Sequence, residues 1–416
     1  MNTELGYGKQ KILFSVPNER VSGVLKPNSV SVFQTGTEEI ERSLDNPIAS
    51  RKLEEIVSPR DTVAIITSDI TRPMPSKTVL PPVLKRLAKA GVKKENIKIV
   101  FALGSHRKHT EEEKKYLVGE EIYDNYTLLD SDENNAVRLG FTSAGTPVDI
   151  FRPVAEADKV ICLGNVEYHY FAGYSGGSKA VMPGVSTRAA IKTNHSMMVM
   201  PEARTGNVLS PVRRDSEEVC LRFVKVAFIV NVVLDEKKTV IKCFSGDVIK
   251  AHRLACEYLD GFYKIKIKKE ADIVVVSAGG YPKDLNMYQA QKALDNAVHA
   301  VRKGGVIIWL AECKEGFGSD TFEKWMTEYT PDFRIEEIKR NFVLGGHKAA
   351  AVAIAGKKAD IYFVGSMDEN TVSKCGLKPF SSLEEAFSAA TERFGENSSV
   401  IVMPYGGSTL PQPENE

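Results

Sequence analysis

Short apolar runs rich in valine and isoleucine alternate along the chain with polar loops and amphipathic segments. The clearest runs cover residues 62–67, 97–103, 159–163, 273–276, 306–310, 361–364 and 400–403. Continuous apolar runs of this length are typical of parallel strands buried on both faces. Between them lie helical patterns such as residues 76–90, with Ser76 placed to cap the helix and Gly91 to end it. This alternation predicts an α/β protein in which helices cover mostly parallel sheets.

One region departs from this alternation and divides the chain. Residues 226–234 and 240–244 flank a polar turn at 235–238, which predicts an antiparallel hairpin, and a helix is expected over 247–263. The lysine-rich stretch 264–269 is expected to be an exposed linker. We therefore predict two domains, 1–268 and 269–403, each with its own sheet. The tail 404–416 is predicted to return to the first domain.

Composition excludes several classes of protein. The chain has 416 residues, with 55 Lys and Arg against 54 Asp and Glu, so its formal charge of +1 gives no basic footprint for nucleic acid or an acidic membrane. No stretch approaches the ~20 apolar residues of a membrane span, and the first residues show no secretory signal. A cytoplasmic location is expected. The six cysteines lack any C-x-x-C pair, which favours reduced, buried thiols over disulfides or a zinc site.

Three polar clusters directly follow predicted strands. They are Ser68-Asp69-Ile70-Thr71-Arg72-Pro73, Gly104-Ser105-His106-Arg107 and Gly164-Asn165-Val166-Glu167-Tyr168-His169-Tyr170. Ligands of open parallel sheets bind beyond the carboxyl ends of the strands, where loops converge. The clusters therefore predict one shared site with an aspartate, an arginine and two histidines.

A glycine-rich segment follows His169 and ends at Lys179. Glycines at this density let backbone N–H groups approach a phosphate, and a lysine adds positive charge. The spacing nevertheless departs from the Walker pattern, because Ser178 separates Gly177 from Lys179 and Ala180 stands where a Mg²⁺-binding hydroxyl is needed. An ordinary ATPase is therefore not expected. One histidine alone does not hold a metal, so if His195 binds one, other donors must come from outside the protein.

The combined motifs resemble those of the nickel-dependent lactate racemase family, over nearly the whole chain. They are S-D-x-T-R-P at 68–73, G-S-H-R at 104–107, N-V-E-Y-H-Y-F-A-G-Y-S-G-G-S-K at 165–179, M-P-G-V at 182–185, N-H at 194–195, A-R-T-G-N at 203–207, G-Y-P at 280–282 and Y-Q-A-Q-K at 288–292. The order and spacing of the set are far more specific than any one motif.

This resemblance implies a cofactor, the nickel-pincer nucleotide. It is a pyridinium-3,5-bisthiocarboxylic acid mononucleotide that holds nickel through sulfur, carbon and sulfur, and dedicated biosynthetic enzymes would supply it. By resemblance, Lys179 forms the covalent tether and His195 is the fourth nickel ligand, a donor set that suits a square-planar metal. The remaining expected cofactor contacts are Asp69, Thr71, Ser175, Gly176, Gly177 and Ser178.

The expected reaction inverts a 2-hydroxy acid, nominally lactate. Direct abstraction of the C2 hydrogen is hard beside a carboxylate, whereas transfer of a hydride to the cofactor gives a planar 2-keto acid that can take the hydride back on either face. The two enantiomers present their hydroxyls differently, so two acid/bases are needed, and His106 and His169 are the candidates. Arg72 is expected to clamp the carboxylate.

The second domain is predicted to add substrate contacts. Gln289 and Lys292 would orient the substrate oxygens and Tyr288 would shape the pocket, which places the active site in a cleft between the domains. Two other classes of function stay open. A non-catalytic carrier of the nickel nucleotide needs Lys179 and His195 but not the two acid/bases, and a nucleotide-dependent transferase would bind ordinary phosphate esters.

Overall fold

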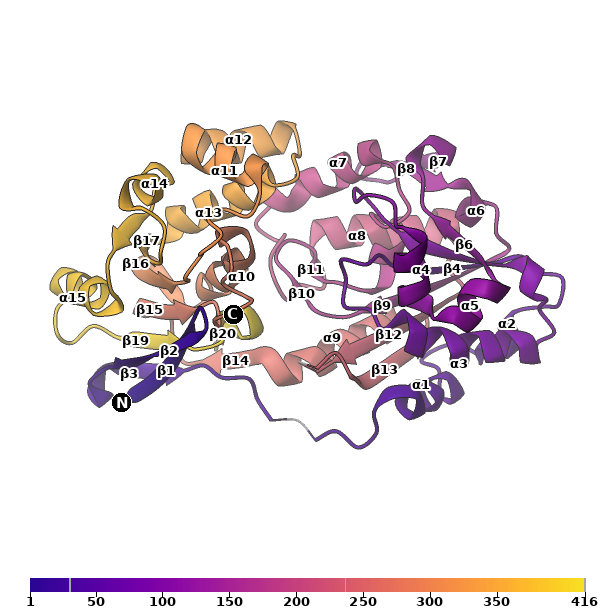
Figure 1. Ribbon diagram of the computed structural model, residues 1–416, viewed down its shortest axis with the longest axis horizontal. Coiled ribbons are helices and arrows are strands. Elements are labelled where there is room, and N and C mark those ends of the chain that lie inside the picture. Colours follow the sequence, from indigo (N-terminus) through magenta and orange to yellow (C-terminus); the bar gives the residue numbers. More distant parts are fainter. Residues whose placement is uncertain (30, 236, 415–416) are drawn as a thin grey trace. The chain divides into compact units, whose positions relative to one another are not determined.

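The computed structural model describes residues 1–29, 31–235 and 237–414, and the chain divides into two compact units (Figure 1). Unit 2 is the continuous segment Val30–Asp260. Unit 1 combines Met1–Ser29 with Gly261–Glu416. Each unit contains a six-stranded sheet, which confirms the predicted α/β class with mostly parallel sheets covered by helices.

Unit 2 is built on a sheet of order β13-β12-β9-β4-β5-β6, parallel except for the β12–β13 hairpin. Its strands are β4 (Val63–Ser68), β5 (Ile97–Ala102), β6 (Thr127–Asp130), β9 (Lys159–Asn165), β12 (Phe228–Leu234) and β13 (Val240–Gly246), with two small hairpins, β7 (Ala136–Phe141) with β8 (Pro147–Phe151) and β10 (Tyr168–His169) with β11 (Gly173–Tyr174). The predicted antiparallel hairpin is confirmed, while Glu236 of its turn lies outside the described residues.

Helices cover both faces of this sheet. They are α1 (Gly36–Asp45), α2 (Leu53–Ile56), α3 (Ser76–Lys89), α4 (Glu111–Val118), α5 (Glu120–Asn125), α6 (Arg152–Ala155), α7 (Arg188–Ser196), α8 (Pro211–Glu218) and α9 (Lys250–Tyr263), with short helices η2 (Lys94–Asn96), η3 (Glu133–Asn135), η4 (Gly177–Ala180), η5 (Met197–Val199) and the π-helix η6 (Val219–Val224). Ser76 begins α3 as predicted, but its hydroxyl bonds to Thr67 instead of capping the helix.

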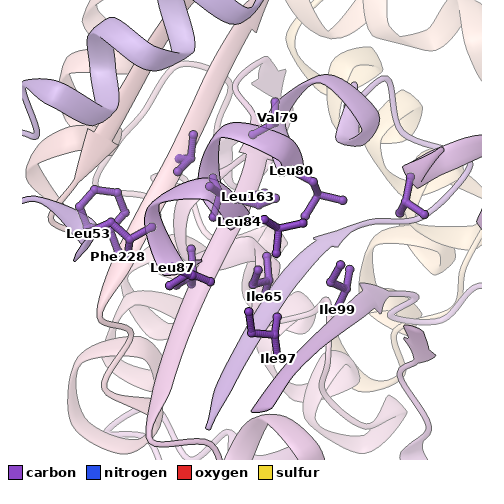
Figure 2. Close-up of a cluster of buried hydrophobic side chains, with 14 of the residues drawn as sticks. Leu53, Ile65, Val79, Leu80, Leu84, Leu87, Ile97, Ile99, Leu163 and Phe228 are labelled. Carbon is purple, nitrogen blue, oxygen red and sulfur yellow. The ribbon is translucent and has the colours of Figure 1, made fainter. Parts of the chain in front are cut away.

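Successive side chains of β4 point to opposite faces of the sheet and so belong to two separate cores. Val63 and Ile65 pack with helices α1 to α5, whereas Ala64 and Ile66 pack with α6, α7, η6 and α9. Figure 2 shows the first core, in which Leu80, Leu84 and Leu87 of α3 lie against Ile65, Ile97 and Ile99 of the sheet. A strand that is apolar on both faces is thereby buried on both faces, as the sequence predicts.

Unit 1 has a fully parallel sheet of order β18-β17-β16-β15-β19-β3. The unit comprises β1 (Asn2–Tyr7), β2 (Gln10–Ser15), η1 (Asn18–Arg20), β3 (Val21–Val24), β14 (Lys264–Ile267), β15 (Ala271–Ser277), α10 (Met287–Ala297), β16 (Val301–Leu310), α11 (Asp320–Glu328), α12 (Pro331–Arg340), α13 (Gly346–Lys358), β17 (Asp360–Val364), α14 (Glu369–Lys374), β18 (Lys378–Phe380), α15 (Leu383–Phe394), β19 (Val400–Met403), η7 (Gly406–Ser408) and β20 (Leu410–Pro413).

The two units differ from the predicted domains at both ends of the chain. The first 29 residues group with the C-terminal part, because β3 pairs with β19. The predicted linker contains β14, which pairs with β20 of the tail, so the tail belongs to the same unit and does not return to the first domain. Residues 415 and 416 of that tail lie outside the described residues. The division after Asp260 replaces the predicted boundary near 268.

Two smaller expectations are also answered by the structure. All six cysteines are buried free thiols, as predicted. Among the described residues, no helix combines the length and apolar character needed to cross a membrane.

The core of Figure 2 makes a quantitative prediction. Leu87 is fully buried in it, so Leu87→Ala should lower the free energy of unfolding by about 2–5 kcal/mol through lost transfer energy and the cavity left behind. Leu221→Ala, at a leucine that is 53% exposed in the same unit, should change it by less than about 0.5 kcal/mol. Urea unfolding followed by circular dichroism measures both, and equal losses would contradict the assignment of this core.

Candidate functional site

The three predicted polar clusters follow neighbouring strands of unit 2. Strand β4 lies between β5 and β9, and all three run parallel, with Ser68 paired to Ala102 and Ile66 to Cys162. The loops that leave their carboxyl ends therefore begin at one edge of the sheet. Chain topology thus brings Asp69, His106 and His169 to the same region, as expected.

The buried Asp69 and the half-buried His106 form a hydrogen-bonded pair. Nδ1 of His106 lies 2.9 Å from Oδ2 of Asp69, and Oδ1 of Asp69 accepts the N–H of Thr71 at 2.7 Å. Burial acts to raise the pKa of Asp69, but the hydrogen bonds from His106 and Thr71 outweigh it, and the net pKa is lowered. The carboxylate can only accept, so Nδ1 of His106 carries a proton and Nε2 has the lone pair of a base.

His169 lies in a different environment, on the β10–β11 hairpin. The N–H of Ala172 donates to its Nδ1 at 3.3 Å, which places the proton of the neutral ring on Nε2. Burial, followed by the positive charges of Lys179, His195 and Arg72, lowers the pKa of His169 well below its usual value. The two histidines therefore differ, since only His106 has a carboxylate partner at the ring.

The ring of Phe171 joins three of the predicted residues. Its centroid lies 4.5 Å from the ring of His169, 4.9 Å from that of His195 and 5.6 Å from Nζ of Lys179. Sequence analysis gave Phe171 no role, because an aromatic residue beside a glycine-rich loop has no distinctive pattern. Its contacts bring the predicted tether and the predicted nickel ligand next to one predicted acid/base.

The surroundings of Lys179 favour the neutral form of its amine. Burial, with the charges of Arg213 and Arg72 nearby, lowers the pKa of its amine well below that of an ordinary lysine. A neutral amine attacks carbonyl-type carbon, whereas an ammonium does not. The residue therefore fits a covalent attachment. The exposed Arg72 lies close enough for its charge to act on both Lys179 and His169.

His195 has a defined tautomer. It lies on α7 directly after Asn194, whose Nδ2 donates to the carbonyl of Val212 at 3.0 Å and to Asp215 at 2.7 Å. The amide oxygen of Asn194 is thus turned to Nδ1 of His195, 2.8 Å away, and accepts its N–H. This leaves the lone pair on Nε2, the arrangement in which a histidine binds a metal. In the described part of the chain, His, Cys, Asp and Glu side chains form no group of three or more suited to a metal.

Arg213 is a second residue that sequence analysis missed. It is fully buried on α8 and donates through Nε to the carbonyl of Ala172 at 3.1 Å, and through Nη2 to the carbonyl of Tyr174. It therefore fixes the backbone between His169 and the glycines. A buried arginine is rare without such partners, but the sequence around Arg213 carries no signal of its burial.

The glycines serve close packing, which changes the predicted phosphate cradle. A Cβ on Gly173 would lie 2.0 Å from the carbonyl oxygen of Asn207, and one on Gly177 would lie 2.7 Å from the ring of His252, with positive φ at both. The N–H of Ser175 donates to Glu167 and that of Gly177 to Asn231, while the hydroxyl of Ser178 pairs with Ser216. These three groups are engaged within the protein, so this conformation does not present them to a phosphate.

The other predicted cofactor and substrate residues are placed as follows. Gly176, with positive φ, precedes η4, and the hydroxyl of Thr71 lies 3.3 Å from Nδ1 of His106. Tyr288, Gln289 and Lys292 lie on α10 of unit 1, where Gln289 and Lys292 are exposed. That these three join the site stays a prediction.

Three further histidines are buried. They are His109, His252 and His347, and burial lowers the pKa of His347 to about 3. The Nε2–H of His252 donates to the carbonyl of Ser175 at 2.9 Å. Isolated histidines have no pattern that separates burial from exposure. The two tryptophans, Trp309 and Trp325, are also buried.

His252 makes stability depend on pH in a predictable direction. Burial, with Arg213 nearby, lowers its pKa well below 6.5, so it stays neutral in the folded chain and binds a proton in the unfolded chain as pH falls below about 6.5. The free energy of unfolding should then fall by up to about 1.4 kcal/mol per pH unit for this group. His252→Gln keeps an N–H donor for Ser175 without a titrating ring. Urea unfolding at pH 6.5 and 5.5 should show a shallower loss in this variant, and equal losses would contradict the assignment.

Comparison with known families covers most of the chain. Two family models match, the lactate racemase N-terminal domain over residues 7–206 and the lactate racemase C-terminal domain over residues 266–410. A lactate racemase of Thermoanaerobacterium thermosaccharolyticum is 37% identical over 335 residues, which are 79% of this chain and 78% of that protein. A lactate racemase of Lactiplantibacillus plantarum is 33% identical over 416 residues, covering 97% and 98% of the two chains.

Solved structures agree with this result. The structure of the lactate racemase apoprotein from Thermoanaerobacterium thermosaccharolyticum matches with a TM-score of 0.89 and 32% identity, over 99% of this chain and all of that one. A crystal structure of a protein from Thermotoga maritima, 21% identical, matches with a TM-score of 0.63 over 92% of this chain and all of that one, which shows a shared fold. On the family matches and the relatives above 30% identity, the chain belongs to the lactate racemase family.

Proposed function

We propose that this chain racemises 2-hydroxy acids, with lactate as the first substrate to test. The proposal includes a nickel-pincer nucleotide tethered to Lys179, nickel bound by His195, and His106 and His169 as acid/bases. The observation that carries it is the contact of His169, His195 and Lys179 with the single ring of Phe171 in a member of this family. Support for the racemase activity comes from the two lactate racemases at 33–37% identity.

The residues at Phe171 suit this cofactor chemically. Lys179 offers a buried amine with a lowered pKa for covalent attachment, and His195 offers the Nε2 lone pair for nickel. When bound, the nucleotide supplies an acceptor that takes a hydride from C2 of the substrate and returns it. Of the predicted phosphate contacts, the N–H groups of Ser175 and Gly177 already bond within the protein, so the phosphate would bind through the N–H groups of Gly176 and Ser178 or through further donors.

The chain's own residues then handle the substrate carboxylate and the hydroxyl proton. The exposed guanidinium of Arg72 can bind a carboxylate through two parallel hydrogen bonds. Nε2 of His106 accepts the hydroxyl proton, and Asp69 balances the positive charge that then forms on the ring. Tyr288, Gln289 and Lys292 are included as substrate contacts from their motif alone.

His169 is suited to the second proton site for an electrostatic reason. Its burial and the nearby charge of Arg72 disfavour the imidazolium, so a proton that His169 has accepted from a substrate hydroxyl is readily returned to a substrate oxygen. The opposite enantiomer is handled by the two rings in exchanged roles. The site thus pairs one ring whose imidazolium a carboxylate stabilises with one whose imidazolium is disfavoured by burial.

The tether is tested by intact-mass measurement. Protein expressed together with the cofactor-making enzymes should carry a covalent adduct, and Lys179→Ala should carry none because the attacking amine is gone. Lys192→Ala, at an exposed lysine on α7, serves as the matched control and should load fully. An adduct on Lys179→Ala would contradict the assignment of the tether.

The acid/base roles are tested by chiral chromatography of lactate and other 2-hydroxy acids with loaded protein. His106→Ala and His169→Ala should each lower kcat by roughly 10²- to 10⁴-fold while keeping the adduct mass, since each removes one proton-transfer group. His299→Ala, at a histidine of unit 1 with no assigned role, should turn over normally. Full turnover by either of the first two variants would refute the two-base assignment.

A further inference from the structure

His109 is a buried histidine outside the predicted site, three residues after His106. It occupies the space between the loop that follows β4 and the end of β6, and its ring lies 4.9 Å from that of Phe101 in β5. Its side chain has no solvent exposure. The ring therefore contacts all three neighbouring strands or the loops that follow them.

Both ring nitrogens of His109 have fixed roles. Nε2 lies 3.0 Å from the backbone N–H of Ile70 and can only accept there. Nδ1 lies 2.6 Å from Oδ1 of Asp130, a carboxylate oxygen, and so donates. The other oxygen of Asp130 accepts the backbone N–H of His109 at 3.0 Å. Asp130 thus holds His109 as a neutral ring in the Nδ1–H tautomer.

The backbone group that His109 holds belongs to the peptide joining Asp69 to Ile70. Asp69 forms a tight turn around this peptide, with its Oδ1 accepting the N–H of Thr71 and its carbonyl accepting that of Arg72 at 3.1 Å. A rotation of this peptide would break the turn that holds Oδ1 of Asp69 on the N–H of Thr71, and so would release the carboxylate from its position on His106. The chain of contacts therefore runs from Asp130 through His109 and the Ile70 amide to Asp69 and His106.

We propose that His109, held by Asp130, is a positioning residue for His106. By fixing the Asp69–Ile70 peptide it keeps the Asp69 carboxylate on Nδ1 of His106, and so keeps the lone pair of His106 on Nε2. The effect on catalysis rests on the proposed function, whereas the effect on the tautomer of His106 belongs to the folded chain alone. A residue that only fills space would leave that tautomer unchanged.

The experiment is nitrogen-15 NMR of the histidines in the apo chain, which has seven. At neutral pH the unmodified chain should show both His106 and His109 as Nδ1–H tautomers. His109→Phe keeps an aromatic ring against Phe101 and removes both nitrogens, so His106 should shift to the Nε2–H tautomer that imidazole prefers in water. Lys108 lies in the same loop as His109 and forms an exposed ion pair with Asp132. The control variant Lys108→Ala removes this ion pair and should leave the tautomer of His106 unchanged.

Loaded protein gives the second readout. His109→Phe should lower kcat roughly 10- to 100-fold, as loss of an outer-shell partner does, while KM changes by less than about threefold. A folded His109→Phe that keeps His106 as Nδ1–H would overturn the proposal. So would an Nε2–H tautomer at His109 in the unmodified chain, a test that needs no variant to fold. If no chain racemises any 2-hydroxy acid, the proposed function fails while the tautomers still decide this inference.

Discussion

The parallel pairing of β4 with both β5 and β9 is the constraint on which the site depends. It makes three loops from distant parts of the sequence begin at one edge of one sheet. A shift of the register by one residue would exchange Ile65 and Ile66 between the two cores and would also displace Asp69 from His106. The same apolar alternation that buries the strands thus sets the geometry of the polar groups at their ends.

Charge is distributed unevenly over that edge. Asp69 supports His106, whereas His169, Lys179 and Arg213 lie together, and burial lowers the pKa of all three although Glu217 lies 3.9 Å from the guanidinium of Arg213. Burying these basic groups together costs folding free energy. Burial favours neutral imidazole and neutral amine, and the charge that remains on Arg213 and the nearby Arg72 would attract an anionic ligand. The arrangement is one in which stability is given up for reactivity.

Sequence patterns predicted the strands and the motif residues but not the packing between them. The apolar runs located β4, β5 and β9 of the first sheet and β15, β16, β17 and β19 of the second, because burial on both faces leaves a clear pattern. Pairing between distant segments leaves no pattern in the sequence, so the pairing of β3 with β19 and that of β14 with β20 were not predicted. The lysines of β14 instead suggested an exposed linker. Lysine is tolerated in such a strand where one side faces water.

Within the site, the sequence predicted the residues with distinctive chemistry, but it did not predict the residues that hold them in place. His106, His169, Lys179 and His195 stand in recognisable motifs, whereas Phe171, Arg213 and His109 act through contacts that only the fold creates. The glycine-rich segment shows the opposite failure. Its composition suggested an open phosphate loop, but its glycines admit Asn207 and His252 at close range.

The threading of the chain has a consequence for its biosynthesis. Unit 1 takes β3 from residues 21–24 and β19 from residues 400–403, and in the sequence the whole of unit 2 lies between these two strands. During translation, every strand of unit 2 is therefore synthesised before β19, the strand that pairs with β3. Unit 2, which contains His106, His169 and Lys179, can fold during translation. Strand β3 remains unpaired along its edge until β19 has been synthesised.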